Sequence, residues 1–288
     1  MAQKVLLEYY RAKLNLVHAV HPGMGSKMAI DLFQRPYARK RKEPPIWQKS
    51  TPFFFNSNGN RIAGYRWVPH APAGKKFLIL HGFSGSGQSF DRYIKPALAK
   101  GYEVHSIDAP GHGKSGGKHL NLLLYSWVIE DLLKQHGPYD RILAHSLSGM
   151  SLMLAIDKLG LHHQKGIMLM APLVTVKSAI RSFQDFLRMR PELRRDFVKG
   201  IEDFAGRPIT YYHMPELIKH HKAPIFWFHD RQDDTTPFSD LAELEHAAPD
   251  HLHLVITENL GHSGIYRENK VYKQVLQILD DAENCRNS

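Results

Sequence analysis

The sequence predicts an α/β fold in which a mostly parallel, twisted sheet carries helices on both faces and is interrupted by one inserted helical segment. Short apolar runs typical of buried parallel strands alternate with segments of helical length. The runs are FLIL (77–80), VHSI (104–107), RIL (141–143), IMLM (167–170), IFWF (225–228) and LHLVI (252–256). The segments 88–99, 122–135, 147–159 and 241–248 are long enough to be crossover helices. This alternation favours parallel strands in one sheet.

Length and composition are those of an ordinary globular protein. The chain has 288 residues, of which 43% are hydrophobic and 23% charged, so it can bury a core. Its net charge of +10 indicates a surface that attracts anions. A single cysteine, Cys285, excludes a disulfide framework and is compatible with a reducing compartment. Because the sequence shows neither an export signal nor an apolar run long enough for a membrane span, we expect a cytoplasmic location.

Residues 1–50 are expected to form an N-terminal helical extension followed by a basic linker. Apolar residues at helical spacing predict an amphipathic helix here, and they are Val5, Leu6, Tyr9, Leu14 and Leu16. We expect this helix to pack on the domain, with contact to a membrane surface or to a partner helix as the alternative. The basic run 39–42 lies beside two prolines and is typical of a solvated linker. No nucleic-acid partner is expected, because no binding module accompanies the run.

Two interruptions of the alternating pattern define the domain organisation. Residues 52–68 contain two β-rich runs separated by turn-forming residues, which predict a hairpin. Between Pro172 and Pro224 no clear strand occurs, and apolar residues recur at helical spacing. We therefore predict a core of residues 51–172 and 224–288, with a helical cap inserted at 173–223.

The run RIL leads directly into a serine-containing turn, Ala144-His-Ser-Leu-Ser-Gly149, that a helical pattern follows. A serine between a strand and a helix, with small residues two positions away on either side, is typical of a nucleophile elbow. The turn is so tight that these flanking positions must be small, and Ala144 and Ser148 meet the requirement. An ordinary turn is the alternative, but the position after a buried strand favours Ser146 as a nucleophile.

A second loop, HGFSG (81–85), follows the run FLIL. Here the backbone N–H of Phe83 is placed to pair with that of Leu147 as an oxyanion hole. An ordinary turn between a strand and a helix is the alternative. The glycine-rich segment DAPGHGKS (108–115), after the run VHSI, is interpreted as a structural turn.

Candidates for an acid and a base come from the two later strand ends. The run IFWF precedes three carboxylates, Asp230, Asp233 and Asp234, of which we select Asp233 with Asp234 as the alternative. The run LHLVI precedes His262, which lies on a short loop after the last predicted strand. The order along the chain is therefore serine, aspartate, histidine, one of the orders known for catalytic triads.

Together these motifs resemble those of the α/β-hydrolase superfamily, of the serine-esterase and lipase type. The resemblance extends from residue 76 to the C-terminus and rests on HGFSGSG, DAPGHGKS, AHSLSG and the loops of Asp233 and His262. It implies an α/β-hydrolase fold and a serine hydrolase that cleaves small-molecule carboxylic esters through an acyl-enzyme. Ser146 is then the nucleophile, His262 transfers the proton, and Asp233 orients the imidazole. The family commonly has a glycine where this chain has Asp230.

The same residues leave other activities open. A thioesterase, an acyltransferase, a peptidase and a C–C bond hydrolase use the same triad, and a ligand-binding protein without catalysis shares the fold. No cofactor is expected, because no P-loop sequence occurs. No metal is expected either, since the adjacent histidine pairs 162–163 and 220–221 point in different directions on a helix.

The predicted cap combines an apolar stripe with an excess of basic residues. Between residues 177 and 207 eight lysines and arginines accompany five acidic residues. The simpler expectation is that the apolar face packs on the domain and the charges are solvated. The sharper hypothesis is that Phe183, Phe186 and Phe197 bind the acyl group of a substrate, while the basic face favours an anionic substrate or a membrane surface.

Overall fold

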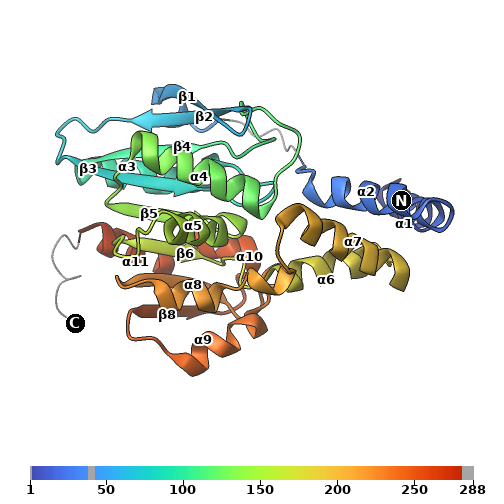
Figure 1. Ribbon diagram of the computed structural model, residues 1–288. Coiled ribbons are helices and arrows are strands. Elements are labelled where there is room, and N and C mark those ends of the chain that lie inside the picture. Colours follow the sequence, from blue (N-terminus) through green and yellow to red (C-terminus); the bar gives the residue numbers. More distant parts are fainter. Residues whose placement is uncertain (1, 38–42, 281–288) are drawn as a thin grey trace. The chain divides into compact units, whose positions relative to one another are not determined.

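The computed structural model describes residues 2–37 and 43–280 (Figure 1). The chain divides into two compact units. The helical unit comprises residues 1–35 and 175–213, and the sheet unit comprises residues 36–174 and 214–288. The predicted linker at 39–42 and Cys285 lie outside the described residues.

One eight-stranded sheet forms the centre of the sheet unit, in the order β1-β2-β4-β3-β5-β6-β7-β8. Its strands are β1 (Thr51–Ser57), β2 (Asn60–Trp67), β3 (Lys75–Leu80), β4 (Tyr102–Ile107), β5 (Arg141–His145), β6 (Ile167–Met170), β7 (Ile225–Asp230) and β8 (Leu252–Thr257). Strands β3 to β8 pair in parallel, while β2 pairs antiparallel with both β1 and β4. The mostly parallel sheet predicted from the apolar runs is confirmed.

The antiparallel pair β1–β2 is joined by a two-residue turn. Ser57 pairs with Asn60, and the intervening Asn58 and Gly59 both have positive φ, at 45° and 73°. Asparagine and glycine tolerate this backbone conformation, which matches the twist of the two strands. The hairpin predicted within 52–68 is therefore present.

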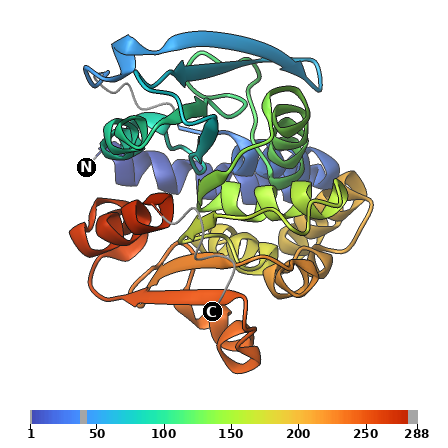
Figure 2. The ribbon, with the colours of Figure 1, turned by 90° about the vertical axis from the view of Figure 1, so that its left-hand side faces the viewer.

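Helices cover both faces of the sheet. On one face lie α3 (Asp91–Ala99) and α11 (Asn269–Asp280), and on the other α4 (Leu122–His136), α5 (Leu147–Lys158) and α8 (Met214–His220) (Figure 2). The two short helices α9 (Ala242–Ala247) and α10 (Gly261–Gly264) flank β8 in the chain. The central strands are consequently buried on both faces, as Leu78, Ile142 and Trp227 illustrate with no exposed surface.

Parallel strands direct their carboxyl ends to one edge of the sheet. The loops after β3, β5, β7 and β8 all leave from that edge. They contain HGFSGSG, the serine turn and the loops of Asp233 and His262, while DAPGHGKS follows β4 at the same edge, so the topology gathers these motifs in one region of the sheet unit.

The helical unit contains α1 (Ala2–Val20), α2 (Pro22–Gln34), α6 (Val176–Phe186) and α7 (Pro191–Ala205). The N-terminal helices and the inserted helices share one core, in which the ring of Phe33 contacts those of Phe183 and Phe197 at 4.8 and 5.5 Å between centroids. Polar contacts add to it: Nε2 of His18 lies 2.9 Å from Oδ2 of Asp196. Within the described residues, no helix is both long and apolar enough to cross a membrane.

Candidate active site

Ser146 occupies a strained turn between β5 and α5. Its φ of 59° and ψ of −126° lie in a region that residues other than glycine rarely adopt, and its side chain is largely buried. The turn is held by a hydrogen bond from the Ser146 amide to the Met170 carbonyl, at 3.0 Å. Ser148 accepts a hydrogen bond from the His145 amide at 2.9 Å, so this small residue also fixes the turn. A Cβ on Gly149 would lie 2.6 Å from Pro172, which explains the glycine there.

The structure brings Ser146, His262 and Asp233 into one hydrogen-bonded chain. Nε2 of His262 lies 3.0 Å from Oγ of Ser146, and Nδ1 of His262 lies 2.8 Å from Oδ2 of Asp233. Asp234, the alternative acid, is exposed, and its carboxylate accepts a hydrogen bond from its neighbour Thr235 instead. The geometry therefore favours Asp233 over Asp234. This is the arrangement in which a serine is activated by an oriented imidazole.

The carboxylate of Asp233 is buried and fully hydrogen-bonded. Its Oδ1 accepts from the amides of Thr235 and Thr236, both at 2.9 Å, and its Oδ2 also accepts from the Thr236 hydroxyl at 2.8 Å. Burial by itself raises the pKa of this carboxyl, but the hydrogen bonds from His262 and Thr236 outweigh it and hold the pKa below its ordinary value. Asp233 is thus kept ionised beside the imidazole.

Asp230 ties the loop that carries Asp233 to the loop that carries His262. This buried carboxylate accepts from the Gln232 amide at 3.1 Å, from the Thr257 hydroxyl at 2.8 Å and from the Gly261 amide at 2.9 Å. Although burial raises its pKa, these hydrogen bonds lower it below the ordinary value of an aspartate. The carboxylate that departs from the family pattern thus has a structural role, which the sequence did not reveal.

His145, which precedes the serine, was not selected from the sequence. Its ring lies 4.7 Å from that of His262, centroid to centroid, and its Nε2 donates to the carbonyl oxygen of His262 at 3.2 Å. Complete burial lowers the pKa of His145 to about 3, and electrostatic repulsion from the neighbouring His262 ring is a second cause. The neutral His145 ring therefore supports the loop of His262 through this hydrogen bond and adds no positive charge beside the His262 imidazole.

His229 is a second histidine that the sequence analysis did not select, and it lies under the acid. The indole N–H of Trp227 donates to Nδ1 of His229 at 3.1 Å, so the ring proton resides on Nε2, which donates to the Thr236 carbonyl at 2.7 Å. Burial lowers the pKa of His229, which keeps it neutral. Alternation along β7 places Trp227 and His229 on the same face of the strand, and this period of two was the available signal.

The two residues predicted to form an oxyanion hole are chain neighbours of Ser146 and of Gly82, which approaches the serine. Leu147 is the first residue of α5, and the first amides of a helix lack a partner within the helix. The loop after β3 abuts Ser146 so closely that a Cβ on Gly82 would lie 2.7 Å from the serine Cβ. Phe83 follows Gly82 in that loop, and the oxyanion hole formed by Phe83 and Leu147 stays a prediction.

The three phenylalanines predicted to bind substrate belong to the helical unit, whereas the triad belongs to the sheet unit. Phe197 is completely buried and stacks on Phe183, at 5.6 Å between centroids. Phe186 is 56% exposed. Substrate binding by these side chains stays a prediction, and Phe197 is in addition a core residue of its own unit.

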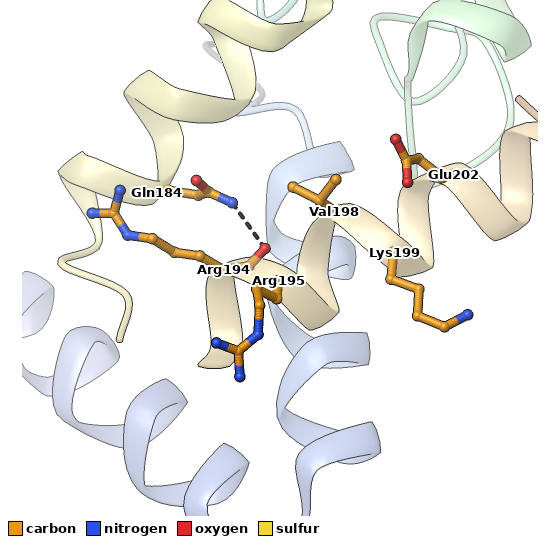
Figure 3. Close-up of a pocket in the computed structure, with 6 residues that line it drawn as sticks. All are labelled: Gln184, Arg194, Arg195, Val198, Lys199 and Glu202. Carbon is orange, nitrogen blue, oxygen red and sulfur yellow. Dashed lines mark hydrogen bonds between the residues drawn. The ribbon is translucent and has the colours of Figure 1, made fainter. Parts of the chain in front are cut away.

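A hollow in the helical unit has different chemistry. Its lining residues are Gln184, Arg194, Arg195, Val198, Lys199 and Glu202 (Figure 3). The amide of Gln184 donates to the Arg194 carbonyl at 3.1 Å across it. The lining contains no serine, cysteine or histidine, so it supplies cationic surface rather than a nucleophile. In the described part of the chain, no group of three or more histidine, cysteine and acidic side chains could hold a metal ion.

Comparison with known proteins identifies the family of this chain. A model of the alpha/beta hydrolase family matches residues 77–272, and the chain belongs to this family. The superfamily predicted from the four motifs is thereby confirmed.

Individual relatives are distant. The chain is similar to a pyrethroid hydrolase of Sphingobium wenxiniae, at 32% identity over 30% of this chain and 30% of that protein. It is also similar to a pimeloyl-acyl-carrier-protein methyl ester esterase of Klebsiella pneumoniae, at 28% identity over 47% of this chain and 49% of that protein. The matches thus span half or less of these two relatives. An esterase of Pyrococcus furiosus has a similar fold, with a TM-score of 0.61 at 18% identity, over 86% of this chain and 97% of that one.

Proposed function

We propose that this protein is a serine hydrolase that cleaves small-molecule carboxylic esters through an acyl-enzyme. The observation that carries the proposal is the hydrogen-bonded chain from Ser146 through His262 to Asp233, with distances of 3.0 and 2.8 Å. The positive φ of Ser146 supports it, because a strained turn between a strand and a helix is the usual setting of this nucleophile.

The proposed reaction has two steps. In the first, the Ser146 oxygen attacks the ester carbonyl while Nε2 of His262 takes the hydroxyl proton, and the amides of Phe83 and Leu147 stabilise the oxyanion. The tetrahedral intermediate then loses the alcohol, which receives that proton. In the second step His262 takes a proton from water, the resulting hydroxide attacks the acyl-enzyme, and Ser146 leaves with the proton. Asp233 stabilises the imidazolium in both steps.

The preference for esters is supported by two of the relatives, a pyrethroid hydrolase and a pimeloyl-acyl-carrier-protein methyl ester esterase. We propose that Phe183, Phe186 and Phe197 contribute to binding the acyl group. No observation favours a thioester, amide or carbon–carbon substrate over an ester. The single cysteine is compatible with a reducing compartment, and we propose the cytoplasm as the location.

The decisive experiment combines active-site labelling with turnover. The wild-type protein should react with a fluorophosphonate probe and hydrolyse p-nitrophenyl esters from acetate to palmitate. Ser146→Ala should abolish labelling and lower kcat by roughly 10⁴-fold or more, because it removes the hydroxyl that lies 3.0 Å from Nε2 of His262. Ser263→Ala is the matched control, since Ser263 is exposed beside His262, and it should leave both readouts unchanged. Retained labelling in Ser146→Ala would refute the assignment.

A second pair of variants tests the acid. Asp233→Asn should slow turnover by roughly 10⁴-fold, because the amide no longer holds the imidazole in the required tautomer. Asp234→Asn, at an exposed neighbouring carboxylate, should have a mild effect. The reverse ranking would transfer the role to Asp234. Adding alcohol and amine acceptors to the same assay separates hydrolysis from acyl transfer.

A further inference from the structure

The first helix has two apolar faces, of which only one is covered. Leu14 and His18 are buried on the inner face, with 1% and 6% of their surface exposed. The outer face carries apolar residues separated by four, seven and four positions, a spacing that places them on one side of a helix. They are Val5, Tyr9, Leu16 and Val20, which are 65%, 54%, 67% and 63% exposed.

This exposure is concentrated in one part of the molecule. Among the described residues, fourteen large hydrophobic side chains are exposed, and ten of them belong to the helical unit, although that unit is only about a quarter of the chain. Leu6 and Met24 extend the set on the first two helices, at 54% and 57% exposed. Single exposed apolar residues are normal on a surface, but a contiguous group of this kind marks an interaction site.

The same unit carries most of the net positive charge. Thirteen lysines and arginines accompany seven acidic residues in residues 1–35 and 175–213, which accounts for more than half of the net charge of +10. The acidic side chains are largely neutralised within the unit, as in the pairs of Asp185 with Arg194 at 2.6 Å and Asp203 with Lys199 at 2.8 Å.

The remaining cations are exposed. Seven of them have no acidic partner within the described part of the chain, and these are Lys13, Lys27, Lys177, Arg181, Arg190, Arg195 and Arg207. Lys13 belongs to the outer face itself, where its ammonium lies 5.5 Å from the centre of the Tyr9 ring. Lys27 lies on α2, one turn after the exposed Met24. Cations without an acidic partner thus lie on or near the outer face of the first helix.

We propose that the outer face of α1, defined by Val5, Tyr9, Leu16 and Val20, docks this protein on an anionic lipid surface. Helices that bind in the plane of a membrane insert an apolar face at the boundary of the headgroups and acyl chains, with lysines and arginines among the headgroups. Such a face could be covered by a second copy of this chain or by an anionic bilayer, and charge distinguishes between these two occupants. A second copy of this chain would bring two units of the same positive sign together, whereas an anionic bilayer is complementary. The inference is independent of the proposed hydrolysis.

The test measures flotation of the full-length protein with vesicles. Vesicles of phosphatidylcholine with phosphatidylserine should bind the wild type, phosphatidylcholine alone should bind it weakly, and added salt should release it because screening weakens the attraction. Leu16→Glu and Val20→Glu should each lower the partition coefficient by about tenfold or more. Val68→Glu is the matched control, since Val68 is a valine 55% exposed on the sheet unit, and it should bind as the wild type does. Lys13→Glu should weaken binding more than Lys95→Glu, which changes an exposed lysine of the sheet unit.

Thermal unfolding monitored by circular dichroism verifies that the variants fold. Folding is expected because every substituted side chain is exposed. Equal binding to neutral and anionic vesicles overturns the proposal, and so does an equal loss of binding in Val20→Glu and Val68→Glu. A further contrary outcome is self-association. If sedimentation shows a dimer that Leu16→Glu dissociates, and no vesicles are bound, the face is an interface between copies of this chain and the lipid proposal is wrong.

Discussion

Replacing His145 with glutamine should make the folded protein less sensitive to acid. In the wild type, burial lowers the pKa of His145 to about 3, whereas a histidine in the unfolded chain titrates near about 6.5. The unfolded state therefore binds more protons than the folded state between these two values. The stabilisation from keeping this ring neutral is complete above about pH 6.5 and is lost as the pH falls toward about 3.

The magnitude follows from the width of that interval. Each pH unit within it changes the free energy of unfolding by about 1.4 kcal/mol for one histidine, so the step from pH 6.5 to pH 5 removes about 2 kcal/mol. Glutamine retains an N–H that can donate to the His262 carbonyl, but it does not titrate. His145→Gln should therefore lose about 2 kcal/mol less than the wild type over the same step.

Urea unfolding of both proteins at pH 7 and pH 5 measures the difference. Other buried histidines with lowered pKa values, such as His105, His221 and His229, titrate in both proteins, so their contributions cancel in the comparison. Asp233 and His262, which face His145 across the site, are also common to both. If both proteins lose the same stability between pH 7 and pH 5, His145 is not held neutral and the reasoning fails.

Three further outcomes test the packing and the polar contacts. Gly82→Ala should lower kcat for ester hydrolysis by more than about tenfold, because the added methyl would lie 2.7 Å from the Cβ of Ser146; an unchanged rate would show that the loop does not confine the serine. Asp230→Ala should lower the free energy of unfolding in urea by about 3 kcal/mol, since three partly buried donors lose their acceptor, and a loss below about 0.5 kcal/mol would contradict this. Phe197→Ala, at a buried ring, should lower the free energy of unfolding in urea by about 3–5 kcal/mol. Phe186→Ala, at an exposed ring, should change it by no more than about 0.5 kcal/mol, and equal losses in the two variants would contradict this.

Local signals in the sequence were sufficient for the framework of the sheet unit. Each predicted parallel strand is present because a short apolar run can bury both of its faces only inside a layered sheet. The turn at Asn58 and Gly59 follows from their tolerance of positive φ. The serine turn was recognisable because the small residues Ala144 and Ser148 are required next to it in the chain. All of these signals act between near neighbours, so the sequence determines them directly.

The tertiary structure decided what depends on contacts between distant residues. Two adjacent aspartates are equivalent in the sequence, and only the direction of the loop after β7 brings Asp233, rather than Asp234, to His262. The neutral state of His145 arises from burial, which no local pattern records. Likewise, the amphipathic pattern of α1 predicted a helix but not which apolar residues would be covered. Leu14 became buried and Leu16 remained exposed because α2, the next helix, and α7, far along the chain, both contact the face of α1 that carries His18.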